Sequence, residues 1–188
     1  MLEIFQGKKK EYNELILKSL IFGSKTTNQI GKYVQLNRRG KPIHVKTIIM
    51  IISRKGSRLR ELETKGYIYR KDKIWNLTFK GLGVALTFFD SLTPIYPQVR
   101  PILHSFVEEF KKRIKKNPTL PAFFKSSKFI RPAMLFESQE FLQLLKDVTN
   151  ELIKQGTDLN QISEENFCAT LLGRVLQIYV AKSLGLPY

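Results

Sequence analysis

The residues of this chain whose types and spacing could do chemistry are mainly arginines and lysines between positions 38 and 73. Arg54 and Arg58 are four positions apart, the spacing of neighbours on one face of a helix. Each guanidinium can donate two hydrogen bonds to the O6 and N7 atoms of guanine, and Ser57 between them can donate or accept one. The pattern therefore predicts contacts to DNA bases from this segment.

Two further groups of basic residues are expected to touch phosphates. One precedes the Arg54 segment, around Arg38, and the other is the tip of a predicted hairpin at Arg70. Phosphate contacts set affinity and its salt dependence, whereas base contacts set sequence preference. A solvated polar face is the alternative for such charges, and we favour it for Glu61 to Lys65. The predicted DNA-binding residues are Arg38, Arg39, Lys41, Lys46, Arg54, Lys55, Ser57, Arg58, Arg70, Lys71 and Lys73.

Other kinds of chemistry find little support in the sequence. Cys168 is the single cysteine, and the two histidines, His44 and His104, are 60 positions apart. Neither a disulfide framework nor a zinc site is expected from so few ligands. No phosphate-binding loop, nucleophile elbow or paired-carboxylate motif is present. We therefore expect no cofactor, no metal and no enzymatic activity.

The charge of the chain is strongly positive and unevenly spread. The 188 residues include 32 Lys and Arg against 16 Asp and Glu, a net charge of +16. Residues 1–90 hold 19 basic and 7 acidic residues, a net of +12, and residues 91–188 hold a net of +4. Such an excess favours a polyanionic partner, although a generally basic protein would show it too. The apolar stretches are too short to span a bilayer, so a cytoplasmic location and no membrane partner are expected.

The basic residues of the first half, residues 1–90, must be positioned by the helices and strands that the hydrophobic pattern of this half predicts. Apolar residues at helical spacing, with caps and stop signals, predict three helices before a hairpin and one after it. Gly56 lies inside the third helix, which could bend or break there. The predicted helices are Lys10–Phe22, Thr26 or Thr27 to Val34, Lys46–Lys65, and Phe79–Phe89 capped by Thr78; the hairpin strands are Tyr67–Arg70 and Ile74–Leu77.

Two stretches of this half resemble a known class of regulators. The first stretch is Leu59-Arg60-Glu61-Leu62-Glu63-Thr64-Lys65-Gly66-Tyr67-Ile68, and the second, after a short hairpin, is Leu77-Thr78-Phe79-Lys80-Gly81. Together they resemble the end of the recognition helix, the wing and the next helix of winged helix-turn-helix regulators. The regulators with this pattern are archaeal and bacterial proteins of the multiple-antibiotic-resistance and phenolic-acid-repressor types. The resemblance covers about residues 10–89. It implies a mainly α fold with a small β-hairpin wing and a transcription-regulating role. The connection Gln35–Val45 is longer than in those families, which shifts where the recognition helix begins.

The second half of the chain is expected to be all helical. Three prolines between Thr93 and Pro101 predict a boundary near residue 91, because proline interrupts helices. The predicted helices are Pro101–Lys116, Ser138–Gln155 and Ser163–Leu184, with a loop over Asn117–Glu137 that holds Phe123, Phe124, Phe129 and Phe136. This half could pair two copies of the chain, or form a lobe that binds a protein or a small molecule.

The sequence thus predicts two domains. Residues 1–90 form a winged helix-turn-helix that binds double-stranded DNA sequence-specifically, and residues 91–188 form a helical region for homodimerisation or for a partner or effector. The alternative is a winged-helix interaction module of a transcription, replication or partition complex, with only non-specific affinity for nucleic acid. A third hypothesis is single-strand binding by Tyr67 and Tyr69, which would share a hairpin face, whereas Trp75 is expected in the core.

Overall fold

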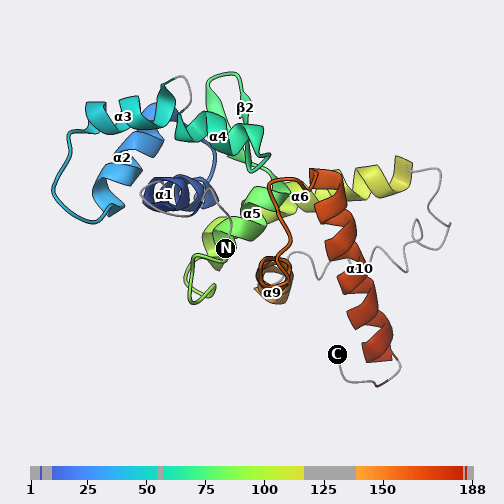
Figure 1. Ribbon diagram of the computed structural model, residues 1–188. Helices are drawn as coiled ribbons and strands as arrows, with labels where there is room; N and C mark the ends of the chain where they lie inside the picture. The colour runs from blue at the N-terminus through green and yellow to red at the C-terminus, as the bar shows by residue number, and fades with distance from the viewer. Residues whose placement is uncertain (1–4, 6–9, 55–56, 117–138, 184, 186–188) are drawn as a thin grey trace.

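The chain folds into a mainly helical structure with one small antiparallel sheet (Figure 1). The computed structural model describes residues 5, 10–54, 57–116, 139–183 and 185. The elements are α1 (Lys10–Ile21), β1 (Lys25–Thr26), α2 (Thr27–Asn37), α3 (Val45–Ser53), α4 (Arg58–Thr64), β2 (Ile68–Lys71), β3 (Ile74–Leu77), α5 (Phe79–Leu86), α6 (Tyr96–Lys116), α9 (Gln139–Lys154) and α10 (Glu164–Ser183). The coarse fold class, mainly α with a hairpin, is confirmed.

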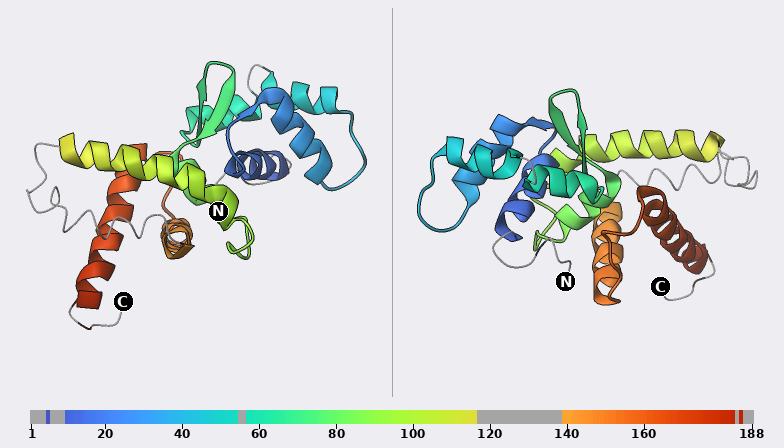
Figure 2. Two further views of the ribbon diagram at one scale, coloured as in Figure 1. Left: turned by 180° about the vertical axis from the view of Figure 1, so that it is seen from behind. Right: turned by 45° about the horizontal axis from the view of Figure 1, so that its top comes forward.

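The sheet has three strands in the order β1-β3-β2. The hairpin of β2 and β3 was expected, and its register pairs Ile68 with Leu77. Strand β1 was not expected, because two residues are too few to show an alternating pattern; it pairs Lys25 with Trp75 on the free side of β3. The hairpin projects beyond the helices on the side where α3 lies (Figures 1 and 2).

The single helix predicted over Lys46–Lys65 is wrong, since the structure has two helices there. Helix α3 ends because Arg54 has an extended backbone, with φ −64° and ψ 163°. A new helix begins after Ser57, whose hydroxyl accepts a hydrogen bond from the Arg60 N–H at 3.5 Å. The interruption falls around Gly56, where a break was foreseen; Lys55 and Gly56 themselves lie outside the described residues.

Several predicted helix ends are confirmed by their caps. The Thr26 hydroxyl accepts from the Gln29 N–H while the Gln29 side chain accepts from the Thr26 N–H, a full capping box. The Thr78 hydroxyl accepts from the Gly81 N–H at 2.9 Å, and the Ser163 hydroxyl accepts from the Asn166 N–H at 3.1 Å. These short-range signals were readable because each cap and its partner are three residues apart.

Helix α6 begins five residues earlier than predicted. The expectation was that the prolines would keep the chain non-helical up to Pro101, but α6 starts at Tyr96 and includes both Pro97 and Pro101. Pro97 lies in the first turn, where an N–H has no intrahelical partner and proline costs little. The predicted cap Ser138, the loop over 117–137 and its four phenylalanines lie outside the described residues.

Both halves of the chain contribute to one hydrophobic core. Helix α5 lies between the α1–α4 group and the C-terminal helices (Figure 1). Its Phe79 ring packs against Phe106 of α6, Phe141 of α9 and Phe167 of α10, with ring centroids 5.2 to 6.3 Å apart. The core therefore runs across residue 91, and the domain boundary proposed there stays a prediction.

A buried lysine and a partly buried glutamate join α5 to the start of α10. Lys80 is 2% exposed, and its ammonium donates to the carbonyls of Lys65, Leu159 and Ile162 at 2.8 to 3.1 Å. The Glu164 carboxylate accepts from the backbone N–H groups of Phe79 and Lys80. Burial lowers the pKa of Lys80 and raises the pKa of Glu164. Such buried charges are tolerated only when hydrogen-bonded, so this arrangement holds the two halves in one geometry.

None of the helices within the described ranges is both long enough and apolar enough to cross a bilayer.

Candidate nucleic-acid interface

Helix α3 divides into a core face and a solvent face. Ile48 and Ile52 are fully buried, and Ile49 packs against Gly31 of α2, where a glycine allows the two helices to approach closely. The solvent face carries Lys46, Thr47, Met50, Ile51 and Arg54, all exposed. No acidic residue occurs in α3, so this face is cationic and partly apolar.

Arg54, the residue that follows α3, ends this face with an exposed guanidinium. Its backbone N–H bonds to the Met50 carbonyl at 3.2 Å, and its Nη2 lies 3.4 Å from the Met50 sulfur. The contact lays the arginine along the helix while the side chain stays exposed. Lys46, the second residue of the helix, is exposed as well. Both predicted residues are thus accessible to a partner.

Ser57 and Arg58 are placed differently from the sequence prediction. The expected helix would have carried them on one face with Arg54, but the break separates them from α3. Ser57 is 4% exposed and caps α4. Arg58 is 18% exposed and its Nη1 lies 2.6 Å from Glu61 Oε2. The prediction that these two side chains are presented to solvent beside Arg54 is therefore wrong.

The basic loop between α2 and α3 is partly committed to internal contacts. Arg38 donates to the Lys41 carbonyl at 2.6 Å, and its guanidinium lies 6.0 Å from the centre of the Tyr12 ring. Arg39 and Lys41 are exposed, and the Arg39 N–H is held by the Glu11 carboxylate. Arg38 thus stabilises the loop, whereas Arg39 and Lys41 present their charges to solvent.

The hairpin tip presents two lysines. Lys71 and Lys73 are exposed on either side of Asp72, whose φ of 57° makes the tight turn. In the second residue pair from the turn, the Arg70 guanidinium lies 5.5 Å from the centre of the Trp75 ring. Trp75 is 5% exposed, which confirms its predicted place in the core, and its indole N–H donates to the Thr27 hydroxyl at 3.0 Å.

The two hairpin tyrosines differ in exposure. Tyr67 precedes β2, is fully buried, and donates its hydroxyl to Asn160 at 3.1 Å. Burial raises the pKa of Tyr67, and the charge of Asp158 adds to the effect. Tyr69, on β2, is 46% exposed. The Tyr67 ring therefore cannot stack on a base, and of the two tyrosines in the single-strand hypothesis only Tyr69 is exposed.

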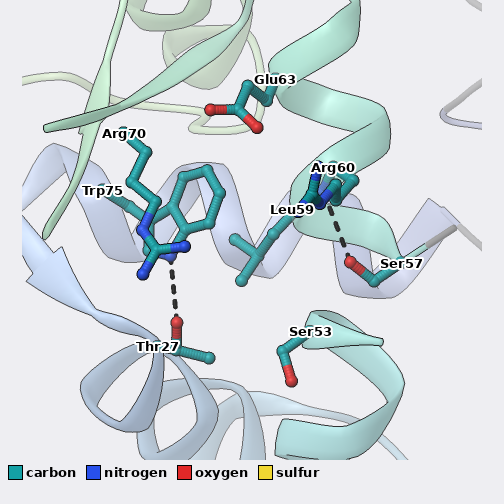
Figure 3. A pocket seen from close by; sticks show the side chains of 8 residues that line it. All are labelled: Thr27, Ser53, Ser57, Leu59, Arg60, Glu63, Arg70 and Trp75. Atoms are coloured by element: carbon teal, nitrogen blue, oxygen red, sulfur yellow. Dashed lines mark hydrogen bonds between the residues drawn. The ribbon is translucent and has the colours of Figure 1, made fainter. Parts of the chain in front are cut away.

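A cleft of about 310 Å³ opens between α4, the hairpin, the first turn of α2 and the last turn of α3 (Figure 3). Arg70 and Trp75 lie on one side of it, and Arg60 and Ser57 on the other. Thr27, Ser53, Leu59 and Glu63 complete the lining. The sequence prediction missed Arg60 and Ser53, because the cleft that they line forms only where α3, α4 and the hairpin come together in the tertiary structure. The only available signal was that Ser57 and Arg60 have the spacing of a cap and its third residue.

The predicted residues thus fall into three groups. Accessible ones line the α3 face, the loop and the hairpin; they are Arg39, Lys41, Lys46, Arg54, Arg70, Lys71 and Lys73. Arg38, Ser57 and Arg58 are engaged within the protein, and Lys55 lies outside the described residues. None of the family models, curated proteins or solved structures compared with this chain matches it.

Proposed function

We propose that this protein is a cytoplasmic, sequence-specific binder of double-stranded DNA that acts as a transcription regulator of the winged-helix type. The observation that carries the proposal is the acid-free solvent face of α3 beside a projecting hairpin with a basic tip. The order of elements from α1 to α5 and the sheet order β1-β3-β2 are compatible with a winged helix-turn-helix. The net charge of +12 in residues 1–90 adds a polyanion preference.

In this proposal α3 lies in the major groove. A helix fits that groove, where each base pair displays its own pattern of donors, acceptors and methyl groups. Arg54 donates to the O6 and N7 atoms of a guanine, and Met50 and Ile51 contact thymine methyl groups. Lys71 and Lys73 hold phosphates on the flanking backbone. The base-reading helix is therefore α3, the first part of the segment Lys46–Lys65 for which the sequence predicts one helix.

The C-terminal helices are proposed to pair two copies of the chain. Two winged helices related by a two-fold axis read half-sites about 34–36 Å apart, one turn of DNA. An inverted repeat in the selected DNA, and a complex of two chains per duplex by light scattering, are the expected results.

The test is selection of duplexes from a randomised library by the full chain, followed by affinities for the selected and a scrambled duplex. Arg54→Ala should cost about 1–3 kcal/mol on the selected duplex and relax the preference at one base pair. Lys71→Ala should weaken both duplexes equally and lower the salt slope by about 0.9. Arg100→Ala, an exposed arginine on α6, is the matched control.

Equal affinity for selected and scrambled duplexes would overturn sequence-specific binding. It would favour the interaction-module hypothesis, in which the chain has only general affinity for nucleic acid. Failure of the full chain to bind any duplex at low salt would reject both DNA-based hypotheses.

A further inference from the structure

The cleft beside α4 is lined mainly by hydrogen-bond donors. The guanidinium groups of Arg60 and Arg70 approach it from a helix and a strand (Figure 3). Within the described part of the chain, neither guanidinium has an ion pair with a carboxylate. The Arg70 guanidinium lies over the Trp75 ring, 5.5 Å from its centre, and this contact favours its orientation beside the cleft. Planar guanidinium forks of this kind suit phosphate oxygens.

The hydroxyl groups of the lining point to the same ligand chemistry. The Thr27 oxygen already accepts from the Trp75 indole, and the Ser57 oxygen accepts from the Arg60 backbone N–H. Each of these two hydroxyls therefore keeps its own hydrogen for a ligand. Thr27 also begins α2, an 11-residue helix whose positive dipole end faces the cleft. The cleft thus offers donors from α2, α4 and β2 to one acceptor-rich group.

The charge of the cleft selects among anions. Two arginines and Glu63 give the lining a net charge of +1. A phosphodiester carries a single negative charge, which this lining balances. A phosphate monoester carries close to two charges at neutral pH and would meet the Glu63 carboxylate. The position of the cleft also favours a phosphate of bound DNA. Ser53 of α3 and Arg70 of the hairpin both border it, so it lies between the two elements that we propose to contact DNA.

We propose that this cleft binds one phosphodiester of the DNA backbone through Arg60 and Arg70, and so fixes the register of α3 on the duplex. The inference rests on the proposed function and deepens it, since it adds a specific phosphate contact that depends on α4 and the hairpin together. The α3 face chooses bases, and the cleft decides where along the backbone the helix is positioned.

The experiment replaces each phosphate of the selected duplex, one at a time, with a neutral methylphosphonate. The full chain should lose about tenfold or more in affinity at one position in each half-site, as expected for hydrogen bonds to a charged group. Arg60→Gln and Arg70→Gln should bind the unmodified duplex more weakly by a similar factor. Both variants should be insensitive to methylphosphonate at that same position. Arg60→Lys should keep the salt slope but recover only part of the affinity, because the fork is lost.

Arg100→Gln on α6 is the matched control, and it should keep the sensitivity of the parent. If Arg60→Gln and Arg70→Gln bind selected duplexes like the parent, the phosphodiester inference is wrong while duplex recognition by α3 stands. A second arm titrates inorganic phosphate into the DNA-free protein. Binding of inorganic phosphate that Arg60→Gln abolishes, without any change in duplex affinity, would assign the cleft to a free phosphate and overturn the inference.

Discussion

Ser57 illustrates how one hydroxyl can have two quite different roles. At the sequence level it lies between Arg54 and Arg58, which suggested contact with a DNA base. In the structure it is 4% exposed, and its oxygen accepts from the Arg60 N–H at the start of α4. A cap satisfies one of the N–H groups that a helix leaves unpaired at its first turn. The side chain therefore stabilises the fold and lies in the cleft beside α4, away from the base-reading face of α3.

Substitution of Ser57 by alanine separates these roles. Ser57→Ala should lower the free energy of unfolding by about 1 kcal/mol, because the cap is lost. Urea denaturation followed by circular dichroism measures this change. The base preference in the selected duplex should stay the same, in contrast to Arg54→Ala. A changed base preference without loss of stability would restore Ser57 to the base-reading set.

At the scale of elements, the start of α5 is the point where the hairpin joins the helical body. The Thr78 hydroxyl donates to the Gly66 carbonyl at 2.7 Å, and Gly66 itself ends the α4 segment with a φ of +72°. Gly81 lies against the Tyr67 carbonyl, so that a Cβ built there would be 1.8 Å from that oxygen. The motif Leu77-Thr78-Phe79-Lys80-Gly81 thus has a structural role. Thr78 caps α5, and Gly81 lets α5 pack closely against the backbone of Tyr67, just before β2.

Gly81→Ala should be among the most damaging single substitutions in the chain. The clash is with backbone, which cannot rotate away, so we expect a loss of about 4 kcal/mol or more, in the extreme tail for point mutants. Thermal and urea unfolding measure it. Gly173→Ala on α10 is the control, since nothing lies within 4 Å of its Cβ position; it should be neutral or stabilising by about 1 kcal/mol. Equal stability of the two variants would contradict the packing argument.

At the scale of the whole molecule, charge and core are distributed differently. Three quarters of the net charge lies in residues 1–90, whereas the hydrophobic core includes residues from both halves of the chain. Phe79 packs against rings from α6, α9 and α10, and the Lys80 ammonium depends on the carbonyls of Leu159 and Ile162. The charged surface belongs to one half, whereas the stability of that half depends on both.

A fragment of residues 1–90 should therefore be markedly less stable than the full chain. Without α9 and α10 the outer face of α5 is exposed, at roughly 1.5–3 kcal/mol for each large apolar side chain. Urea unfolding of the fragment should show a lower midpoint and a shallower transition than the full chain. A fragment that unfolds cooperatively at the same midpoint would instead establish residues 1–90 as an independent domain.

The sequence alone determined the local features of this protein. The caps at Thr26, Thr78 and Ser163, the hairpin and the excess of positive charge were all predictable, because each depends on residues a few positions apart or on composition. The tertiary structure decided the rest. Trp75 meets Thr27 across 48 positions, and Glu164 caps α5 across 85. Packing between distant elements also buries Ser57 and forms the cleft, and such packing is not encoded in any local period.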